Sequence, residues 1–235
     1  MLLSICIPTF NRANNLANCL NSIVISNNFA NFDKIEVCVS DNCSSDNTKA
    51  IVDSFKDKVN IRYSRNEKNL GFARNAIKVI SMAKGKYSWL IGDDDLIIPA
   101  CITKLIDIFK KNTSVDYFFI NSYYLNSNYL KKFKAPFNTE NLELETLKKL
   151  SDINENKVVN FWQIIDPKVS WEFLIGIYLS IFNTKKWIQA SAKVDKEKLK
   201  DVGVWSNFEN TCLHPIVIAE AFKDSQCYIC SDALS

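Results

Sequence analysis

The chain has 235 residues, of which 47% are hydrophobic, and it carries a formal net charge of +3. This length predicts one large domain, or one domain with a small appendage, with enough apolar material for a packed core. The charge is too small to indicate a nucleic-acid-binding surface. Because the start lacks the pattern of a signal peptide and no apolar run reaches the roughly 18 residues of a spanning helix, we expect a soluble protein.

The eight cysteines are expected to be reduced. Cys6 and Cys38 fall inside apolar strand patterns, and Cys227 and Cys230 share the strand-like run Cys-Tyr-Ile-Cys. Thiols in such places serve as small core residues more often than as disulfides. The single histidine excludes a histidine-rich metal site.

Strand and helix patterns alternate along the first half of the chain. Apolar runs predict strands at residues 2–9, 35–39, 59–63 and 87–91. A polar loop follows each run, and helical spacing of apolar residues follows the first three loops. The alternation predicts an α/β fold with a mostly parallel sheet and right-handed crossovers. Since parallel strands end at one edge, where such sheets bind ligands, we expect the polar loops to form the site.

The loop after the fourth strand contains three consecutive aspartates, Asp93, Asp94 and Asp95, preceded by Gly92 and flanked by apolar runs. Adjacent carboxylates repel one another and favour a positive partner. Mg²⁺ or Mn²⁺ is the natural one, because these ions take oxygen ligands and keep positions open for water and phosphates. The alternative is a polar turn that caps the helix beginning near Pro99.

The second half has weaker patterns. A helix at 100–111 and a strand at 117–121 precede a stretch, 122–168, that we interpret as an insertion or lid with several aromatic residues. Beyond it we expect a strand at 176–183, helices at 184–191 and 208–222, and a strand at 226–230. The expected division is therefore 1–121 and 122–235, and the lack of a closing helix indicates a truncated chain.

The five glycines form neither the dinucleotide fingerprint nor the Walker pattern, so a nucleotide would have to be held by side chains and a metal. Four blocks resemble, in order and spacing, the family 2 glycosyltransferases with the GT-A fold. They are Ile-Cys-Ile-Pro-Thr-Phe-Asn-Arg at 5–12, Val-Ser-Asp-Asn-Cys-Ser-Ser-Asp at 39–46, Asn-Leu-Gly-Phe-Ala-Arg-Asn at 69–75 and Gly-Asp-Asp-Asp at 92–95. The resemblance covers about the first hundred residues and is thin after residue 121.

The resemblance implies a nucleotide-sugar donor, with a UDP-sugar favoured, bound across the strand ends. The residues that would line the nucleoside pocket are Pro8, Thr9, Asn11 and Arg12, with Asp41 accepting a hydrogen bond from the base. Arg74 and Asn75 would face the phosphates or ribose, unless they only form a helix surface. Asp93 and Asp94 would hold the ribose and the metal, and the contiguous aspartates leave Asp95 as a rival metal ligand.

The implied reaction needs a metal ion and a general base. A divalent metal neutralises the charge on the leaving diphosphate. A general base activates the acceptor hydroxyl, and in inverting members of the family it is a carboxylate of the second half. Our candidate is Glu209, with Glu172 and Asp201 as alternatives.

Two more residues of the second half are candidates for the site. His214 is either structural or a ligand of the metal or pyrophosphate. Trp171 either stacks on a sugar or packs in the core.

The leading hypothesis is a metal-dependent inverting glycosyltransferase that adds a sugar to a saccharide or lipid-linked saccharide in surface polysaccharide synthesis. The alternatives are a nucleotidyltransferase, which normally has a Gly-rich basic loop after its first strand, and a binding module without activity. Cytosolic nucleotide sugars imply a cytoplasmic protein. The lysines at 131, 132 and 134 suggest peripheral contact with the inner face of the membrane.

Overall fold

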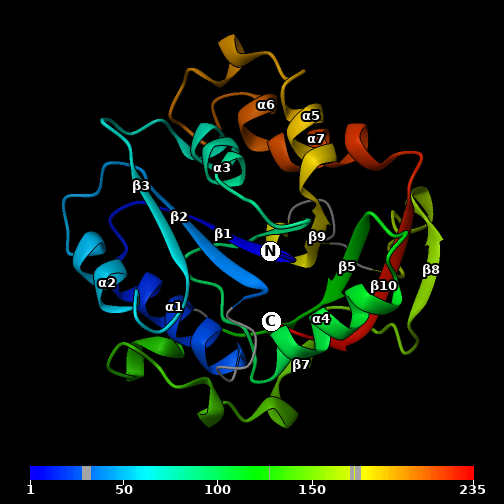
Figure 1. The fold of residues 1–235 in the computed structure, drawn as a ribbon, viewed down its shortest axis with the longest axis horizontal. Coiled ribbons are helices and arrows are strands. Elements are labelled where there is room, and N and C mark those ends of the chain that lie inside the picture. The colour runs from blue at the N-terminus through cyan, green and yellow to red at the C-terminus, as the bar shows by residue number, and fades with distance from the viewer. Residues whose placement is uncertain (28–32, 127, 170–171, 173–175) are drawn as a thin grey trace.

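The structure, a computed structural model, describes residues 1–27, 33–126, 128–169, 172 and 176–235. Its centre is an eight-stranded sheet with the order β3-β2-β1-β4-β9-β5-β10-β8 (Figure 1). The strands of this sheet are β1 (Leu3–Thr9), β2 (Ile35–Asp41), β3 (Ile61–Arg65), β4 (Tyr87–Leu90), β5 (Tyr117–Asn121), β8 (Lys157–Asn160), β9 (Ser180–Asn183) and β10 (Gln226–Ala233). A separate antiparallel pair joins β6 (Tyr123–Tyr124) to β7 (Lys148–Lys149). The predicted α/β class is confirmed.

Helices lie on both faces of the sheet (Figure 1). The α-helices are α1 (Ala13–Asn27), α2 (Thr48–Ser54), α3 (Phe72–Ser81), α4 (Cys101–Lys111), α5 (Thr184–Ser191), α6 (Phe208–Thr211) and α7 (Leu213–Phe222). Short 3₁₀ helices are η1 (Leu130–Lys132), η2 (Thr139–Asn141), η3 (Leu144–Thr146), η4 (Phe161–Gln163), η5 (Ile177–Leu179) and η6 (Lys196–Leu199). Three layers result, with the sheet in the middle.

The first four strands form the parallel part of the sheet. β1 pairs in parallel with β2 and β4, and β2 pairs in parallel with β3. All residues of β1 and β2 are buried, which explains their continuous apolar runs. β3 begins two residues later than predicted, because Val59 is still in the turn after α2, where its N–H donates to the Phe55 carbonyl.

The second half of the chain completes the same sheet. β9 pairs antiparallel with both β4 and β5, β10 lies parallel to β5, and β8 is an antiparallel edge strand. The predicted strand at 176–183 begins as η5 and becomes extended only at Ser180. One sheet therefore runs through both expected parts of the chain, 1–121 and 122–235.

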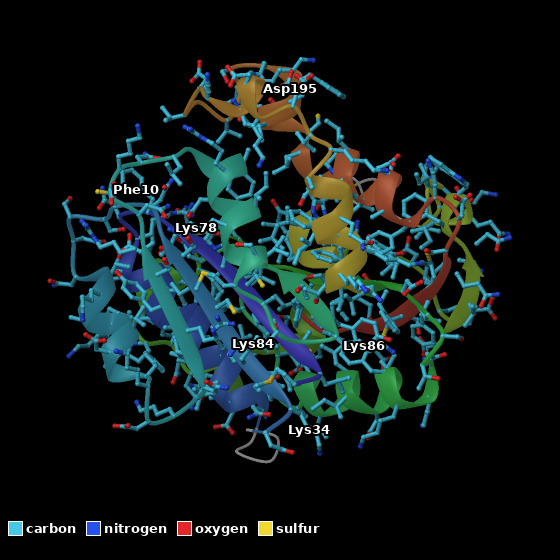
Figure 2. All side chains as sticks on the ribbon, turned by 45° about the horizontal axis from the view of Figure 1, so that its top comes forward. Phe10, Lys34, Lys78, Lys84, Lys86 and Asp195 are labelled. Carbon is cyan, nitrogen blue, oxygen red and sulfur yellow. The ribbon has the colours of Figure 1, made fainter. Side chains whose placement is uncertain are left out.

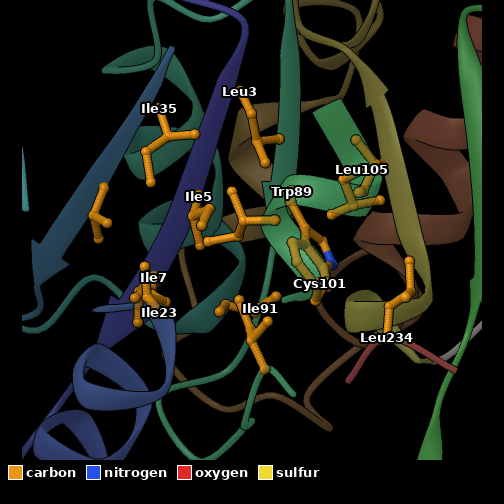
Figure 3. Close-up of a cluster of buried hydrophobic side chains, with 14 of the residues drawn as sticks. Leu3, Ile5, Ile7, Ile23, Ile35, Trp89, Ile91, Cys101, Leu105 and Leu234 are labelled. Carbon is orange, nitrogen blue, oxygen red and sulfur yellow. The ribbon is translucent and has the colours of Figure 1, made fainter. Parts of the chain in front are cut away.

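Each face of the sheet has its own hydrophobic core. Figure 3 shows part of the first, where Leu3, Ile5 and Trp89 of the sheet pack near Ile23 of α1 and Leu105 of α4. The second core packs α3, α5 and α7 against the other face and contains the stacked rings of Phe182 and Trp187. These two cores fix the strands, and the strand ends carry the loops.

The segment 122–168 is irregular, as expected. Tyr129, Phe133 and Phe137 form a small aromatic cluster, with ring centroids 4.9 to 6.1 Å apart. Phe137 is fixed to α1, since its N–H donates to Asn18 Oδ1 and its carbonyl accepts from Asn21 Nδ2, both at 2.8 Å. In Figure 1 the first, green part of this segment runs along the outer side of α1, whereas β8, near its end, lies at the far edge of the sheet.

The predicted helix at 208–222 is wrong in one respect, because two helices, α6 and α7, meet at Cys212. Pro215 gives the reason. In a continuous helix its ring would clash with the preceding turn and remove a hydrogen bond, whereas a new start at Leu213 places it in a first turn, where proline is tolerated.

The eight cysteines are free, and six of them are buried, as their apolar surroundings predict. None of the helices in the described ranges is long and apolar enough to cross a membrane.

His214 lies buried on α7, against β9. Its Nε2 is 3.4 Å from Ser180 Oγ, and its ring is near that of Phe182. Nδ1 finds no hydrogen-bond partner in the part of the chain that the structure describes. Burial lowers the pKa of His214 to about 3, so the folded protein holds it neutral.

This histidine predicts an acid-sensitive contribution to stability. Because its unfolded pKa is near 6.5, the unfolded state binds the proton first, and stability is lost as the pH falls below that value. Between pH 7.5 and pH 5, we expect the loss from His214 to be about 2 kcal/mol. Urea unfolding of wild type and His214→Gln gives the change in the free energy of unfolding between pH 7.5 and pH 5 for each protein. The difference between these two changes is the contribution of His214.

Asp95, whose raised pKa changes stability in the opposite direction over this range, is present in both proteins and cancels in the comparison. Equal pH-dependent changes in the two proteins would contradict the buried, neutral state of His214.

Candidate functional site

The polar loops gather at the carboxyl edge of the parallel strands. Thr9, at the end of β1, is in register with Asp41 at the end of β2, which is in register with Arg65 of β3. Figure 2 shows Phe10, which follows β1, at the other end of the strands from Lys34 and Lys86, which precede β2 and β4. The expected edge is therefore the one at which the site is built.

Asp93 joins the ends of β1 and β4. Its Oδ2 accepts from Thr9 Oγ1 at 2.7 Å and its Oδ1 accepts from Arg12 at 2.8 Å. Burial raises the pKa of Asp93, and the bonds from Thr9 and Arg12 oppose that rise. The carboxylate is thus held rigidly and almost out of solvent.

Asp94 points toward solvent instead. Its side chain is 53% exposed, and its Oδ2 lies 3.1 Å from the second terminal nitrogen of Arg12. One guanidinium therefore spans two neighbouring carboxylates. Arg12 is itself half exposed, so it can move while Asp93 keeps its bond to Thr9.

Asp95 turns back onto its own loop. Its Oδ2 accepts from the N–H of Gly92 at 2.6 Å, and burial raises its pKa to about 7. A Cβ at Gly92 would lie 2.7 Å from Asp94 Oδ1 and 3.2 Å from Asp95 Oδ2. Glycine at this position avoids a steric clash with these two carboxylates.

The loop after β2 is built around buried Asp41. Its Oδ1 accepts from the N–H of Ser44 at 2.8 Å, and its Oδ2 accepts from the hydroxyl of Tyr63 at 2.6 Å. The Ser44 hydroxyl in turn accepts from the N–H of Asn11, which has a left-handed φ of 53°. Asp41 therefore shapes the two loops, and Pro8 is buried in β1 beside them.

Asn75 and Arg74 also have partners within the protein. The Asn75 amide exchanges hydrogen bonds with Ser40 and accepts from Asn66, all between 2.7 and 2.9 Å. The Arg74 guanidinium donates to the carbonyls of Leu70 and Lys200. These two residues hold the start of α3 against the loops around it.

A cavity of about 930 Å³ opens beside the aspartates. Its lining includes the polar side chains of Arg12, Asn14, Asn18, Asp94 and Asp95. Residues of the irregular segment after β5 and Tyr178 of η5 also line it.

Glu172, one of the two alternative bases, reaches this cavity through Tyr178. Its Oε2 accepts from the Tyr178 hydroxyl at 3.0 Å. Burial raises the pKa of Tyr178, with Glu172 and then Asp95 adding to the rise, which places both carboxylates in the neighbourhood of this hydroxyl. No local sequence pattern distinguishes Glu172, because its relation to the cavity is created by the fold.

The other candidates of the second half lie elsewhere. Glu209 lines a separate groove between α5 and α7 and forms an ion pair with Lys198. Asp201 lies in the loop seated on Gly71, where its carboxylate accepts from the N–H of Gly203. Trp171 lies outside the described residues.

The structure does not bring all the predicted metal ligands together. Among the described residues, no three His, Cys, Asp or Glu side chains come together in a way that could hold a metal ion. The structure therefore does not unite His214 with Asp94 and Asp95 as a ligand set. A half-exposed carboxylate at a cavity still fits an ion that takes one or two protein oxygens and completes its shell with phosphates and water.

Comparison with known proteins identifies the family. The model of "Glycosyl transferase family 2" matches residues 4–162, more than half of the chain. Abequosyltransferase RfbV of Salmonella typhimurium is 46% identical over 99 residues, which cover 41% of this chain and 29% of that protein. Poly(ribitol-phosphate) beta-N-acetylglucosaminyltransferase TarS of Staphylococcus aureus is 32% identical over 98 residues, 41% of this chain and 17% of TarS.

A solved structure of one of these proteins has a similar fold. The crystal structure of S. aureus TarS 1–349 in complex with UDP superposes with a TM-score of 0.71 at 19% identity, over 100% of this chain and 59% of that one. The chain thus spans only part of the length of the proteins it matches. With the mostly parallel sheet and its helices, this likeness confirms the GT-A fold, and the chain belongs to glycosyl transferase family 2.

Proposed function

We propose that the chain transfers a sugar from a nucleoside diphosphate sugar to an acceptor hydroxyl in polysaccharide synthesis. The observation that carries the proposal is the junction of β1 and β4, where Thr9 and Arg12 fix Asp93 while Asp94 stays exposed at a large cavity. Family membership and the glycosyltransferase names of the relatives support it. Because nucleotide sugars are cytosolic, the proposal includes a cytoplasmic location.

The donor nucleotide would bind where the loops of β1 and β2 meet. Hydrogen bonds with Ser44 and Ser45 hold the backbone and the side chain of Asn11 there, so this residue has a fixed position between the two loops. Asp41, although buried, sets this loop and remains our proposed contact for the base, with Pro8, Thr9 and Arg12 around it. Arg74 and Asn75 would act mainly by holding the start of α3. The TarS complexes with UDP and UDP-GlcNAc support uridine as the base.

A divalent cation, Mn²⁺ or Mg²⁺, would be held by Asp94, with Asp95 as the second candidate. When bound, it supplies neutralisation of the leaving diphosphate. Arg12 already pairs with the two carboxylates in the protein alone, and its half-exposed guanidinium would turn from Asp94 toward a phosphate once a cation takes its place there. Asp93 would position the ribose, because its bond to Thr9 keeps it in place.

We propose Glu172, rather than Glu209, as the general base. Glu172 is linked by Tyr178 to the cavity that contains Asp94, whereas Glu209 is engaged with Lys198 in the other groove. In the proposed single displacement, the acceptor oxygen forms a bond to the sugar's anomeric carbon as the bond to the diphosphate breaks. The acceptor proton moves to the Glu172 carboxylate. One such step inverts the configuration at that carbon.

The donor site predicts a metal-dependent nucleotide affinity. We expect UDP to bind wild type at least tenfold more tightly with Mn²⁺ than without, and Asp94→Asn to lose that gain, because the amide is a poorer ligand for a hard cation. Isothermal titration calorimetry measures both. Asp107→Asn, at an exposed carboxylate on α4, is the matched control and should behave as wild type. UDP affinities that depend neither on Mn²⁺ nor on Asp94 would contradict the donor site and favour the alternative of a binding module without activity.

The base assignment predicts a contrast between two glutamates. Glu172→Gln should lower kcat by about 10²- to 10⁴-fold, the usual contribution of a general base, with donor affinity unchanged. Glu209→Gln should keep kcat within about threefold of wild type. Release of the nucleoside diphosphate in the presence of acceptor reports the rate. The reverse pattern, with Glu209→Gln impaired and Glu172→Gln active, would return the role to Glu209.

A further inference from the structure

A network of buried side-chain amides joins the elements that surround the proposed donor site. Its members are Asn42 directly after β2, Asn66 directly after β3 and Asn75 of α3, and none of them is more than 4% exposed. Asn66 lies at the centre, because its Nδ2 donates to Asn42 Oδ1 and to Asn75 Oδ1, both at 2.9 Å. Both protons of this amide are therefore used, and one side chain connects two strand ends to a helix.

The outer two amides have a hydrogen-bonding direction that backbone groups set. The N–H of Leu70 donates to Asn42 Oδ1 at 2.8 Å, and Asn75 Nδ2 donates to the carbonyl of Ser40 at 2.9 Å. Asn42 and Asn75 must therefore both present an oxygen to Asn66. A side chain fits between these two oxygens only if it can donate to both of them.

The oxygen of the Asn66 amide has a partner on α3. Lys78, half-buried and labelled in Figure 2, lies one turn beyond Asn75, and its ammonium group donates to Asn66 Oδ1. Because an ammonium group can only donate, it favours the orientation in which both Nδ2 protons of Asn66 face the other amides. A carboxylate in place of Lys78 would favour the reverse orientation, in which Asn66 Oδ1 faces two other oxygens.

The network is directly connected to residues that we propose for the donor site. The N–H of Asn42 donates to the carbonyl of Thr9, and the N–H of Asn66 donates to the carbonyl of Asp41, both at 2.8 Å. The Asn42 amide also donates to Asn69 Oδ1 at 2.7 Å, in the turn before α3. A change in the orientation of Asn66 would therefore disturb the β2 loop and the start of α3 together.

We infer that Asn66 is a positioning residue of the donor site and that Lys78 sets the orientation of its amide. The two residues act by holding the β2 loop and the start of α3 in one relative position, so that the nucleotide meets a preformed site. The inference rests on the proposed function, because it concerns the same donor site. Both residues lie outside the four blocks that carry the family resemblance, and only the fold brings them together.

Two substitutions reverse the hydrogen-bonding direction, one from each side of the contact. Asn66→Asp keeps the shape but replaces the inward donors with an acceptor, and Lys78→Glu replaces the donor on α3 with an acceptor. By calorimetry, we expect each to weaken Mn²⁺-dependent UDP binding about tenfold, the effect of leaving a buried polar group without its partner. Lys78→Arg, which keeps a donor, should bind UDP as the wild type does.

The side-chain amide signals of the network give a readout that needs no nucleotide. In ¹⁵N spectra of the protein alone, we expect the Asn42 and Asn75 side-chain signals to shift in Asn66→Asp and Lys78→Glu, and to stay in place in Lys78→Arg. A role in stability alone would lower the urea midpoint without changing the UDP affinity of the folded protein.

Matched controls separate this effect from charge and from stability. Lys111→Glu makes the same change of charge at the end of α4, and Asn183→Asp places a carboxylate beside Asp116 at the opposite edge of the sheet. Both should bind UDP as the wild type does. Urea unfolding shows which variants are folded, and if Asn66→Asp is not, Lys78→Glu decides the outcome.

The inference is overturned if folded Asn66→Asp and Lys78→Glu proteins bind UDP like the wild type, or if Lys111→Glu weakens UDP binding as much as Lys78→Glu does. Either result, with UDP bound by the wild type, would leave the donor site intact. A wild-type protein that binds no UDP would instead refute the donor site itself, and the positioning role with it.

Discussion

The contact between Thr9 and Asp93 is the interaction on which the site depends. It joins the ends of two neighbouring strands through a carboxylate that is almost fully buried. Burying a charge is costly unless it is paired and hydrogen-bonded, and here a hydroxyl and a guanidinium provide both. Because Asp93 is fixed, the exposed side chain of the next residue, Asp94, has a defined position at the cavity. The rigid aspartate thus sets the position of the exposed one.

The topology explains how one edge of the sheet brings together loops from both halves of the chain. The parallel strands β1, β2 and β3 bring their loops to the edge where we propose that the nucleotide binds. β9 then enters between β4 and β5, and the chain just before it carries Tyr178 and Glu172 to the cavity. The segment after β5 forms the remaining wall. In the proposed function, donor chemistry would come from the first half of the chain, and the acceptor surroundings would come mainly from the second.

The first half could be predicted from sequence because its signals are local. Fully buried parallel strands are continuous apolar runs, and the loops that follow them carry the polar residues, so β1, β2 and β4 were placed within one or two residues. The apolar spacing that predicts one helix at 208–222 takes no account of Pro215, the residue that explains the break at Cys212. Glu209 is the candidate from the sequence because its place at the start of a helix in the second half loosely resembles that of the family's acidic pair. Only the fold shows that Glu172 accepts a hydrogen bond from Tyr178, which lines the cavity, and our proposal of Glu172 as the base rests on that contact.

The most direct test of the account is the position of the metal-nucleotide complex. ¹⁵N-labelled protein with UDP is titrated with Mn²⁺, and paramagnetic broadening of assigned amide signals is measured. The account predicts strong broadening at Asn11, Ser44 and Gly92, at the carboxyl edge, and sharp signals at Ala190 and Val217 in the groove between α5 and α7. Broadening centred on that groove, or equal broadening with and without UDP, would contradict the central claim that a nucleotide and a metal bind together at Asp94.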